Sequence, residues 1–133
     1  MRLFLRSEFT SPDDPDTEVI EQEFSCEIKL RGRTWFVTYT EYTDGGECEV
    51  ALAYNGKRLT MARRGAVKVT LGFSPKEKFS TLYTVGGMRM NMMTYTTELS
   101  GELTERGGEI TLGYDMNVGG VPRTALLRFK FTP

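Results

Sequence analysis

The stretch Glu109–Val118, which reads EITLGYDMNV, indicates the fold class because apolar and polar side chains alternate along it. One parity holds Ile110, Leu112, Tyr114, Met116 and Val118. The other holds Glu109, Thr111, Gly113, Asp115 and Asn117. A period of two is the pattern of a β-strand with one buried face, whereas an amphipathic helix repeats every 3.6 residues. The stretch therefore predicts a strand with one side in the core.

The same alternation recurs along most of the chain. It is found at Trp35–Glu41, Val67–Phe73, Phe79–Val85 and Ala125–Phe131. Turn signals separate the runs, namely Asn55-Gly56 and the glycine pairs at 86–87, 107–108 and 119–120. No helical segments alternate with the strands. We therefore predict an all-β domain, an antiparallel up-and-down closed β-barrel of about eight to ten strands with little or no helix.

The glutamate-rich segment Thr17–Leu30 is the one place where a helix competes with a strand. Ile20, Phe24 and Ile28 have helical spacing, but Cys26 and Leu30 would point away from that stripe. Alternation fits nearly every position. We predict one long strand, bent midway.

Size and charge limit the classes of function. The 133 residues suit a single domain spanning 1–133. With 17 basic and 18 acidic residues, the net charge of -1 argues against nucleic acid and anionic membranes as partners. Arg6 and Glu8 interrupt the apolar N-terminus, so we expect no secretory signal and a cytoplasmic protein.

The chain contains no histidine, which removes Ser-His-Asp and Cys-His catalysis and the commonest metal ligand. We expect no metal site, no cofactor and no catalytic residue. Cys26 and Cys48 are expected to be reduced thiols, with Cys26 in the core.

Three segments together resemble a known family. They are Val37–Glu41, Met61–Lys68 and Gly108–Gly119. They are similar to the YwiB-like family, a bacterial domain of unknown function, and the resemblance runs from about Thr17 to Phe131. It implies a calycin-type (lipocalin-like) barrel in a bacterial, cytoplasmic setting and brings no catalytic residues. Gly86-Gly87-Met88 stands where the family tends to carry a Pro-x-Gly turn, so this turn is expected to differ in shape.

Four polar residues are candidates for a ligand site inside the barrel: Tyr39, Glu41, Arg63 and Tyr114. Glu41 shares an inward parity with Tyr39, and a buried carboxylate is costly unless it is paired. Arg63 is its expected partner. Such a pair with two tyrosines would fix the polar end of a ligand. The alternative is a solvated Glu41 at a strand end and a structural Arg63.

Met90 and Met92 are the apolar candidates, since they alternate with Met88 along one strand. A methionine row inside a barrel either lines an adaptable pocket or fills the core. The run Arg63-Arg64-Gly65 is open to two readings, an anion-binding turn or an ordinary hairpin turn.

We therefore expect a module that binds a small apolar or amphipathic ligand inside the barrel. One alternative is an interaction or structural domain with a filled core, as a monomer or homodimer. The other is a histidine-free enzyme that uses Glu41 or Asp115 with Arg63 and Tyr114. Asp115 is expected to face outward, because its parity is polar.

Overall fold

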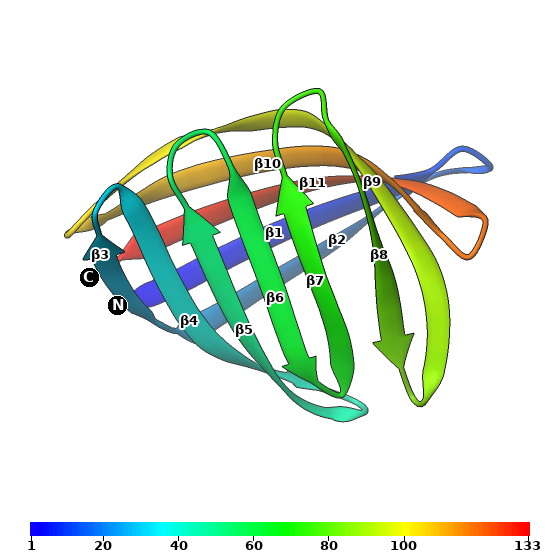
Figure 1. Ribbon diagram of the computed structural model, residues 1–133, viewed down its shortest axis with the longest axis horizontal. Helices are drawn as coiled ribbons and strands as arrows, with labels where there is room; N and C mark the ends of the chain where they lie inside the picture. The colour runs from blue at the N-terminus through cyan, green and yellow to red at the C-terminus, as the bar shows by residue number, and fades with distance from the viewer.

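The computed structural model describes all 133 residues and contains eleven antiparallel strands and no helix (Figure 1). The chain forms no apolar helix of membrane-spanning length. The strands are β1 (Arg2–Ser11), β2 (Asp14–Ser25), β3 (Glu27–Arg31), β4 (Thr34–Thr43), β5 (Gly46–Tyr54), β6 (Leu59–Gly65), β7 (Val67–Phe73), β8 (Lys78–Val85), β9 (Met88–Thr104), β10 (Gly107–Val118) and β11 (Val121–Thr132).

The strands follow one another around a curled sheet in the order β2-β1-β11-β10-β9-β8-β7-β6-β5-β4-β3. Every ladder joins strands that are consecutive in sequence, except that β1 pairs with β11. Both termini therefore lie at the same end of the molecule (Figure 1). The predicted all-β, antiparallel, up-and-down barrel is confirmed.

The predicted long strand Thr17–Leu30 is divided at Cys26 into β2 and β3. Ser25 pairs with Arg2 of β1, whereas Glu27 pairs with Thr38 of β4. Between them, the Cys26 amide donates a hydrogen bond to the Met1 carbonyl at 2.9 Å. Because the chain changes partners here, the bend adds a strand, and the expected count of eight to ten was too low.

Because of this change of partners, β2 and β3 are the two edge strands of the sheet, and no backbone ladder joins them to each other. The part of β4 from Tyr39 to Thr43 pairs with β5 alone, and β2 pairs with β1 alone. We call the region between these two free strand edges the open corner. The barrel is therefore closed by the bent chain rather than by a continuous set of hydrogen bonds.

The core is packed most tightly at the end that holds the termini. Leu3, Leu59, Phe73, Ile110 and Phe129 are all under 2% exposed there. Toward the opposite end, inward-facing apolar side chains are only partly covered, namely those of Phe9, Met90, Met116 and Val118. The filling of the barrel is therefore uneven along its length.

Gly101 lies in the part of β9 that continues beyond its pairing with β8 and pairs with β10 alone. Its carbonyl accepts a hydrogen bond from the Tyr54 hydroxyl of β5 at 2.7 Å, which ties the two sides of the barrel together. Its φ is +133°, and a Cβ there would lie 2.1 Å from the Glu109 carbonyl oxygen. Only glycine fits this position without displacing β10.

We predict that Gly101→Ala lowers the free energy of unfolding by about 3 kcal/mol, because positive φ and backbone overlap combine. Gly32→Ala is the matched control, since Gly32 also has positive φ but a Cβ there meets nothing within 4 Å. The control should cost about 1 kcal/mol. Urea unfolding measures both variants, and equal losses would show that the close approach to Glu109 is absent.

Candidate ligand-binding site

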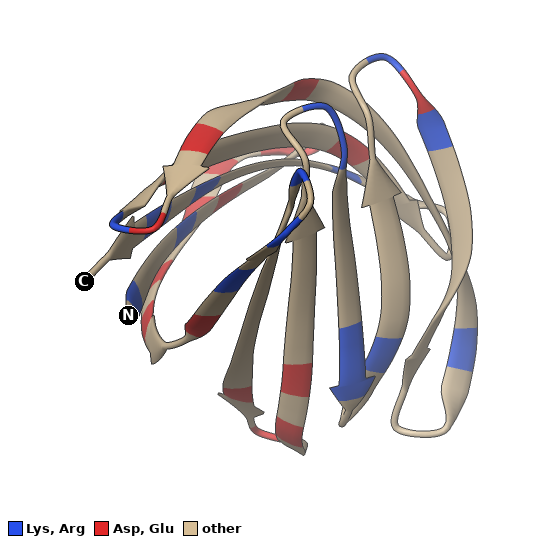
Figure 2. Cartoon of the chain, turned by 60° about the vertical axis from the view of Figure 1, so that its left-hand side comes forward, with Lys and Arg blue, Asp and Glu red and all other residues tan.

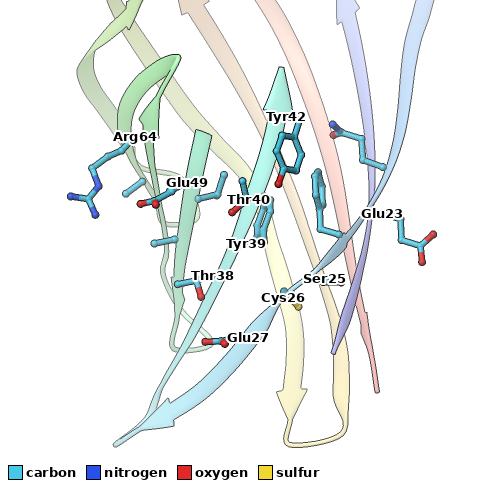
Figure 3. Close-up of a pocket in the computed structure, with 15 residues that line it drawn as sticks. Glu23, Ser25, Cys26, Glu27, Thr38, Tyr39, Thr40, Tyr42, Glu49 and Arg64 are labelled. Carbon is cyan, nitrogen blue, oxygen red and sulfur yellow. The ribbon is translucent and has the colours of Figure 1, made fainter. Parts of the chain in front are cut away.

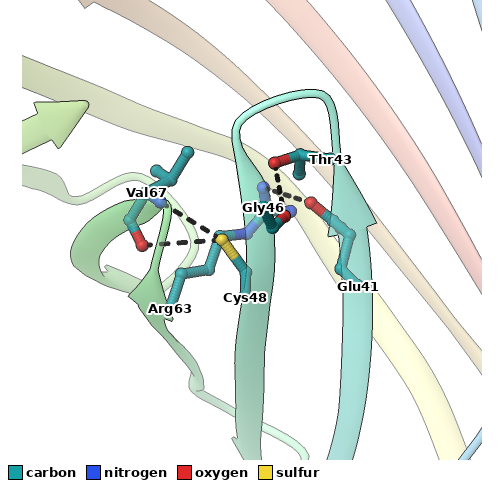
Figure 4. Close-up of polar contacts among 6 residues, drawn as sticks. All are labelled: Glu41, Thr43, Gly46, Cys48, Arg63 and Val67. Carbon is teal, nitrogen blue, oxygen red and sulfur yellow. Dashed lines mark hydrogen bonds and ion pairs between the residues drawn. The ribbon is translucent and has the colours of Figure 1, made fainter. Parts of the chain in front are cut away.

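Glu41 and Arg63 form an ion pair inside the barrel. Arg63 Nη1 lies 3.4 Å from Glu41 Oε1 (Figure 4). The Glu41 side chain is 9% exposed and that of Arg63 is 25% exposed. Their strands are joined through β5, where Val50 is opposite both Tyr39 and Arg63. The predicted pairing of Glu41 with Arg63 is confirmed.

Both predicted tyrosines are buried in the barrel, and Tyr39 lies two residues before Glu41 on β4. Burial raises the pKa of Tyr39 to about 12, while Arg63 lowers it and Glu41 raises it by smaller amounts. Burial also raises the pKa of Tyr114, with Arg63 and Arg123 acting in the opposite direction. The Tyr39 ring packs against Phe24 with centroids 4.7 Å apart, and the Tyr114 ring packs against Phe73 with centroids 4.8 Å apart. We call Tyr39, Glu41, Arg63 and Tyr114 the inner polar cluster.

Four buried polar atoms in the barrel have no hydrogen-bond partner. They are Tyr39 Oη, Arg63 Nε, Thr94 Oγ1 and Thr96 Oγ1. Buried polar groups in proteins are almost always paired, because an unpaired one retains the full cost of leaving water. All four atoms carry a hydrogen that they are able to donate. This part of the barrel is therefore suited to a group that accepts hydrogen bonds.

Thr94 and Thr96 were not among the residues that we expected to form a site. Thr96 is opposite Tyr114 in the ladder between β9 and β10. Both threonines are buried and share the inward parity of Met92. That shared parity was the available signal, but threonine is so common in strands that it did not stand out.

A cleft of about 1120 Å³ lies at the open corner (Figure 3). Phe24 of β2 and Tyr39 of β4 meet in it, with ring centroids 4.7 Å apart. Tyr39 thus belongs to both the cleft and the inner polar cluster. Cys26 also lines the cleft, and burial raises the pKa of its thiol against a smaller opposing effect of the N-terminal amino group.

The predicted methionines lie elsewhere. Met92 is 5% exposed and opposite both Val118 and Thr81, and Met90 is partly buried further along β9. Neither lines the corner cleft. They extend the inward row that contains Thr94 and Thr96, and their part in ligand binding stays a prediction.

Arg63, Arg64 and Gly65 are the last three residues of β6, and the single residue Ala66 connects them to β7. Gly65 has a φ of +131°, and the next amide, that of Ala66, donates to the Glu47 carbonyl at 3.0 Å. Arg63 points inward to Glu41, whereas Arg64 is exposed. The two guanidinium groups therefore do not converge on one anion.

Asp115 is exposed on the outer face of β10, as expected, and accepts a hydrogen bond from the Thr124 hydroxyl at 2.9 Å. Glu41 is buried on the inner side. These two carboxylates lie on opposite faces of the barrel wall, so they do not form an acid–base pair. Both cysteines are free and buried, in agreement with the expected thiols.

We predict that Tyr39→Phe weakens the loss of stability at alkaline pH. Tyr39 keeps its proton up to about pH 12 in the folded protein, whereas an unfolded tyrosine loses it near about pH 10. Its contribution is therefore complete below about pH 10 and is lost as pH rises toward 12. Urea unfolding at a series of pH values measures this, with Tyr42→Phe as the exposed control. An unchanged pH dependence in Tyr39→Phe would contradict the buried setting.

We also predict that Arg63→Met alone costs about 2 kcal/mol of unfolding free energy, because it leaves the buried Glu41 carboxylate unpaired. Adding Glu41→Leu should restore most of this loss. The exposed pair of Arg6 and Glu21, which are 2.9 Å apart, supplies the control cycle. Its coupling should be below about 0.5 kcal/mol. Equal coupling in the two cycles would show that the inner pair is solvated.

Comparison with known proteins places this fold in a family. A model described as "Domain of unknown function (DUF1934)" matches residues 5–125. The "Uncharacterized beta-barrel protein YwiB" of Bacillus subtilis (strain 168) is 26% identical over 107 residues, which is 80% of this chain and 75% of that protein. The crystal structure of the ywiB protein from Bacillus subtilis superimposes with a TM-score of 0.86 at 22% identity, covering 99% of this chain and 91% of that one. The chain therefore belongs to the DUF1934 family.

Proposed function

We propose that the barrel binds a small amphipathic molecule, with its polar end at the inner polar cluster. The observation that carries this proposal is the pair of buried donors without partners, Arg63 Nε and Tyr39 Oη. A ligand that accepts from both would remove the cost of burying them unpaired. No group of three or more acidic or cysteine side chains is arranged to hold a metal ion.

The charge of the cluster indicates the kind of polar end. Glu41 already neutralises Arg63, so the ion pair has no net charge. A carboxylate beside it would meet Glu41 as well as Arg63, whereas a neutral carbonyl accepts the same hydrogen bonds without repulsion. We therefore favour a neutral head group, such as an amide or ester, over an acid.

The apolar part of the molecule would lie along the inner wall formed by Met92 and Met90. Methionine adapts to ligands of different shape. Met116 and Val118, also partly buried, stand on the neighbouring strand β10. In this proposal the corner cleft is the way in, because Tyr39 is the residue of the inner polar cluster that lines it.

The expected likeness to calycin-type barrels supports the same reading, because such barrels commonly carry apolar ligands. Both the likeness to calycin-type barrels and the cytoplasmic setting are parts of this proposal.

The test is isothermal titration with decanamide and decanoate, two probes that differ only in the head group. We expect decanamide to bind and decanoate to bind at least tenfold more weakly. Glu41→Leu together with Arg63→Met should weaken decanamide binding about tenfold while keeping the fold, since the pair is replaced by apolar groups. Arg106→Met, on an exposed turn, is the control.

Two results would contradict the proposal. One is that neither probe binds. The other is that the Arg106→Met control and the double variant bind decanamide equally, which would place the ligand away from the inner polar cluster.

A further inference from the structure

A second cleft lies on the outer face of the barrel, separate from the proposed ligand site. It has a volume of about 370 Å³ and lies over β2, β1, β11 and β10. Its lining includes Phe4, Arg6, Arg128 and Lys130. This volume is at the lower end of the range for small-molecule sites.

The register of β1 and β11 determines how these side chains face one another. Phe4 is opposite Lys130, and Arg6 is opposite Arg128. Opposed residues in an antiparallel pair have Cβ atoms about 5 Å apart, and like charges in such positions destabilise the sheet. Glu21 and Glu8 already offset the charge of Arg6, so Arg128 is the arginine that is left to bind an added anion.

Two carboxylates also line the cleft, those of Glu21 and Glu109, and only Glu21 takes part in an ion pair. Arg2 pairs with Glu23, and Arg6 pairs with Glu21 at 2.9 Å and with Glu8 at 3.1 Å. Glu109 is opposite Lys130 in the ladder, but no ion pair joins them. Neither Arg128 nor Lys130 takes part in an ion pair, and together with Arg6 they give the cleft three cations against the two carboxylates of Glu21 and Glu109.

Phe4 adds an aromatic face beside these cations. Phe4 is 40% exposed, so one face of its ring is open to solvent, as are several other large apolar residues on this surface. A planar ring stacks on such a face, while a guanidinium fork matches the oxygens of a phosphate. Stacking and anion recognition thus lie next to each other.

We propose that Phe4, Arg128 and Lys130 form a binding site for a mononucleotide, with the base on Phe4 and the phosphate on the two cations. A single nucleotide fits better than a nucleic-acid strand, because the cleft offers one aromatic face. Charges of both signs are also interspersed over the molecule instead of forming a basic track (Figure 2). This site is independent of the ligand proposed for the interior.

The test is isothermal titration at low salt with adenosine monophosphate, adenosine and inorganic phosphate. We expect the nucleotide to bind at least tenfold more tightly than either half. Arg128→Glu should reduce nucleotide affinity at least tenfold and remain folded, because the new carboxylate faces Arg6. Phe4→Leu should weaken the nucleotide and adenosine while leaving phosphate binding unchanged.

Arg106→Glu makes the same charge change on an exposed turn and serves as the control. Equal losses in Arg128→Glu and Arg106→Glu would overturn the proposal, since they would reflect overall charge alone. It would also be overturned if the nucleotide bound no more tightly than inorganic phosphate, because Phe4 would then have no part in recognition.

Discussion

The pairing of β1 with β11 is the constraint on which the rest of the barrel depends. It is the one ladder between strands that are not consecutive in sequence, and it sets Arg2 opposite Thr132. Joining the two ends of a chain costs more loop-closure entropy than forming a local hairpin does. Leu3 and Leu5 of β1 are buried with Phe129 and Phe131 of β11, and this apolar contact offsets that cost.

Beside this closure at the termini, the curl is completed by the bend at Cys26, whose amide donates a hydrogen bond to the Met1 carbonyl. At the bend, one edge of β2 and part of one edge of β4 are left without a partner strand. The corner cleft lies beside these two unpaired edges. Tyr39 connects that cleft to the buried pair of Glu41 and Arg63. The polar interior is thus a consequence of how the barrel closes, and it adjoins the apolar end, because the Tyr114 ring packs against Phe73 with ring centroids 4.8 Å apart.

The alternation of apolar and polar side chains predicts most of the strands. The run from Ile110 to Val118 is β10, as its period predicts. The bend was placed midway in Thr17–Leu30, but the alternation passes through Cys26 without a break. The change of partner from β1 to β4 is a long-range event that no local pattern records. The division into two strands therefore required the structure.

For the candidate site too, the local sequence pattern predicted which side chains point inward but not which of them lie next to each other. Parity placed Tyr39 and Glu41 inside, and the cost of a buried carboxylate pointed to Arg63. The same reasoning from the sequence did not select Thr94 and Thr96. Their importance depends on the pairing of Thr96 with Tyr114 across the ladder between β9 and β10. The methionines were placed on the correct strand, but their distance from the corner cleft depends on how the sheet curls.

The most direct test of the polar interior is a crystal structure of the protein grown with decanamide. The account predicts that the amide carbonyl oxygen accepts hydrogen bonds from Arg63 Nε and Tyr39 Oη, with the chain along Met92. Density for the ligand elsewhere, or both donors bonded to groups of the protein itself, would contradict it.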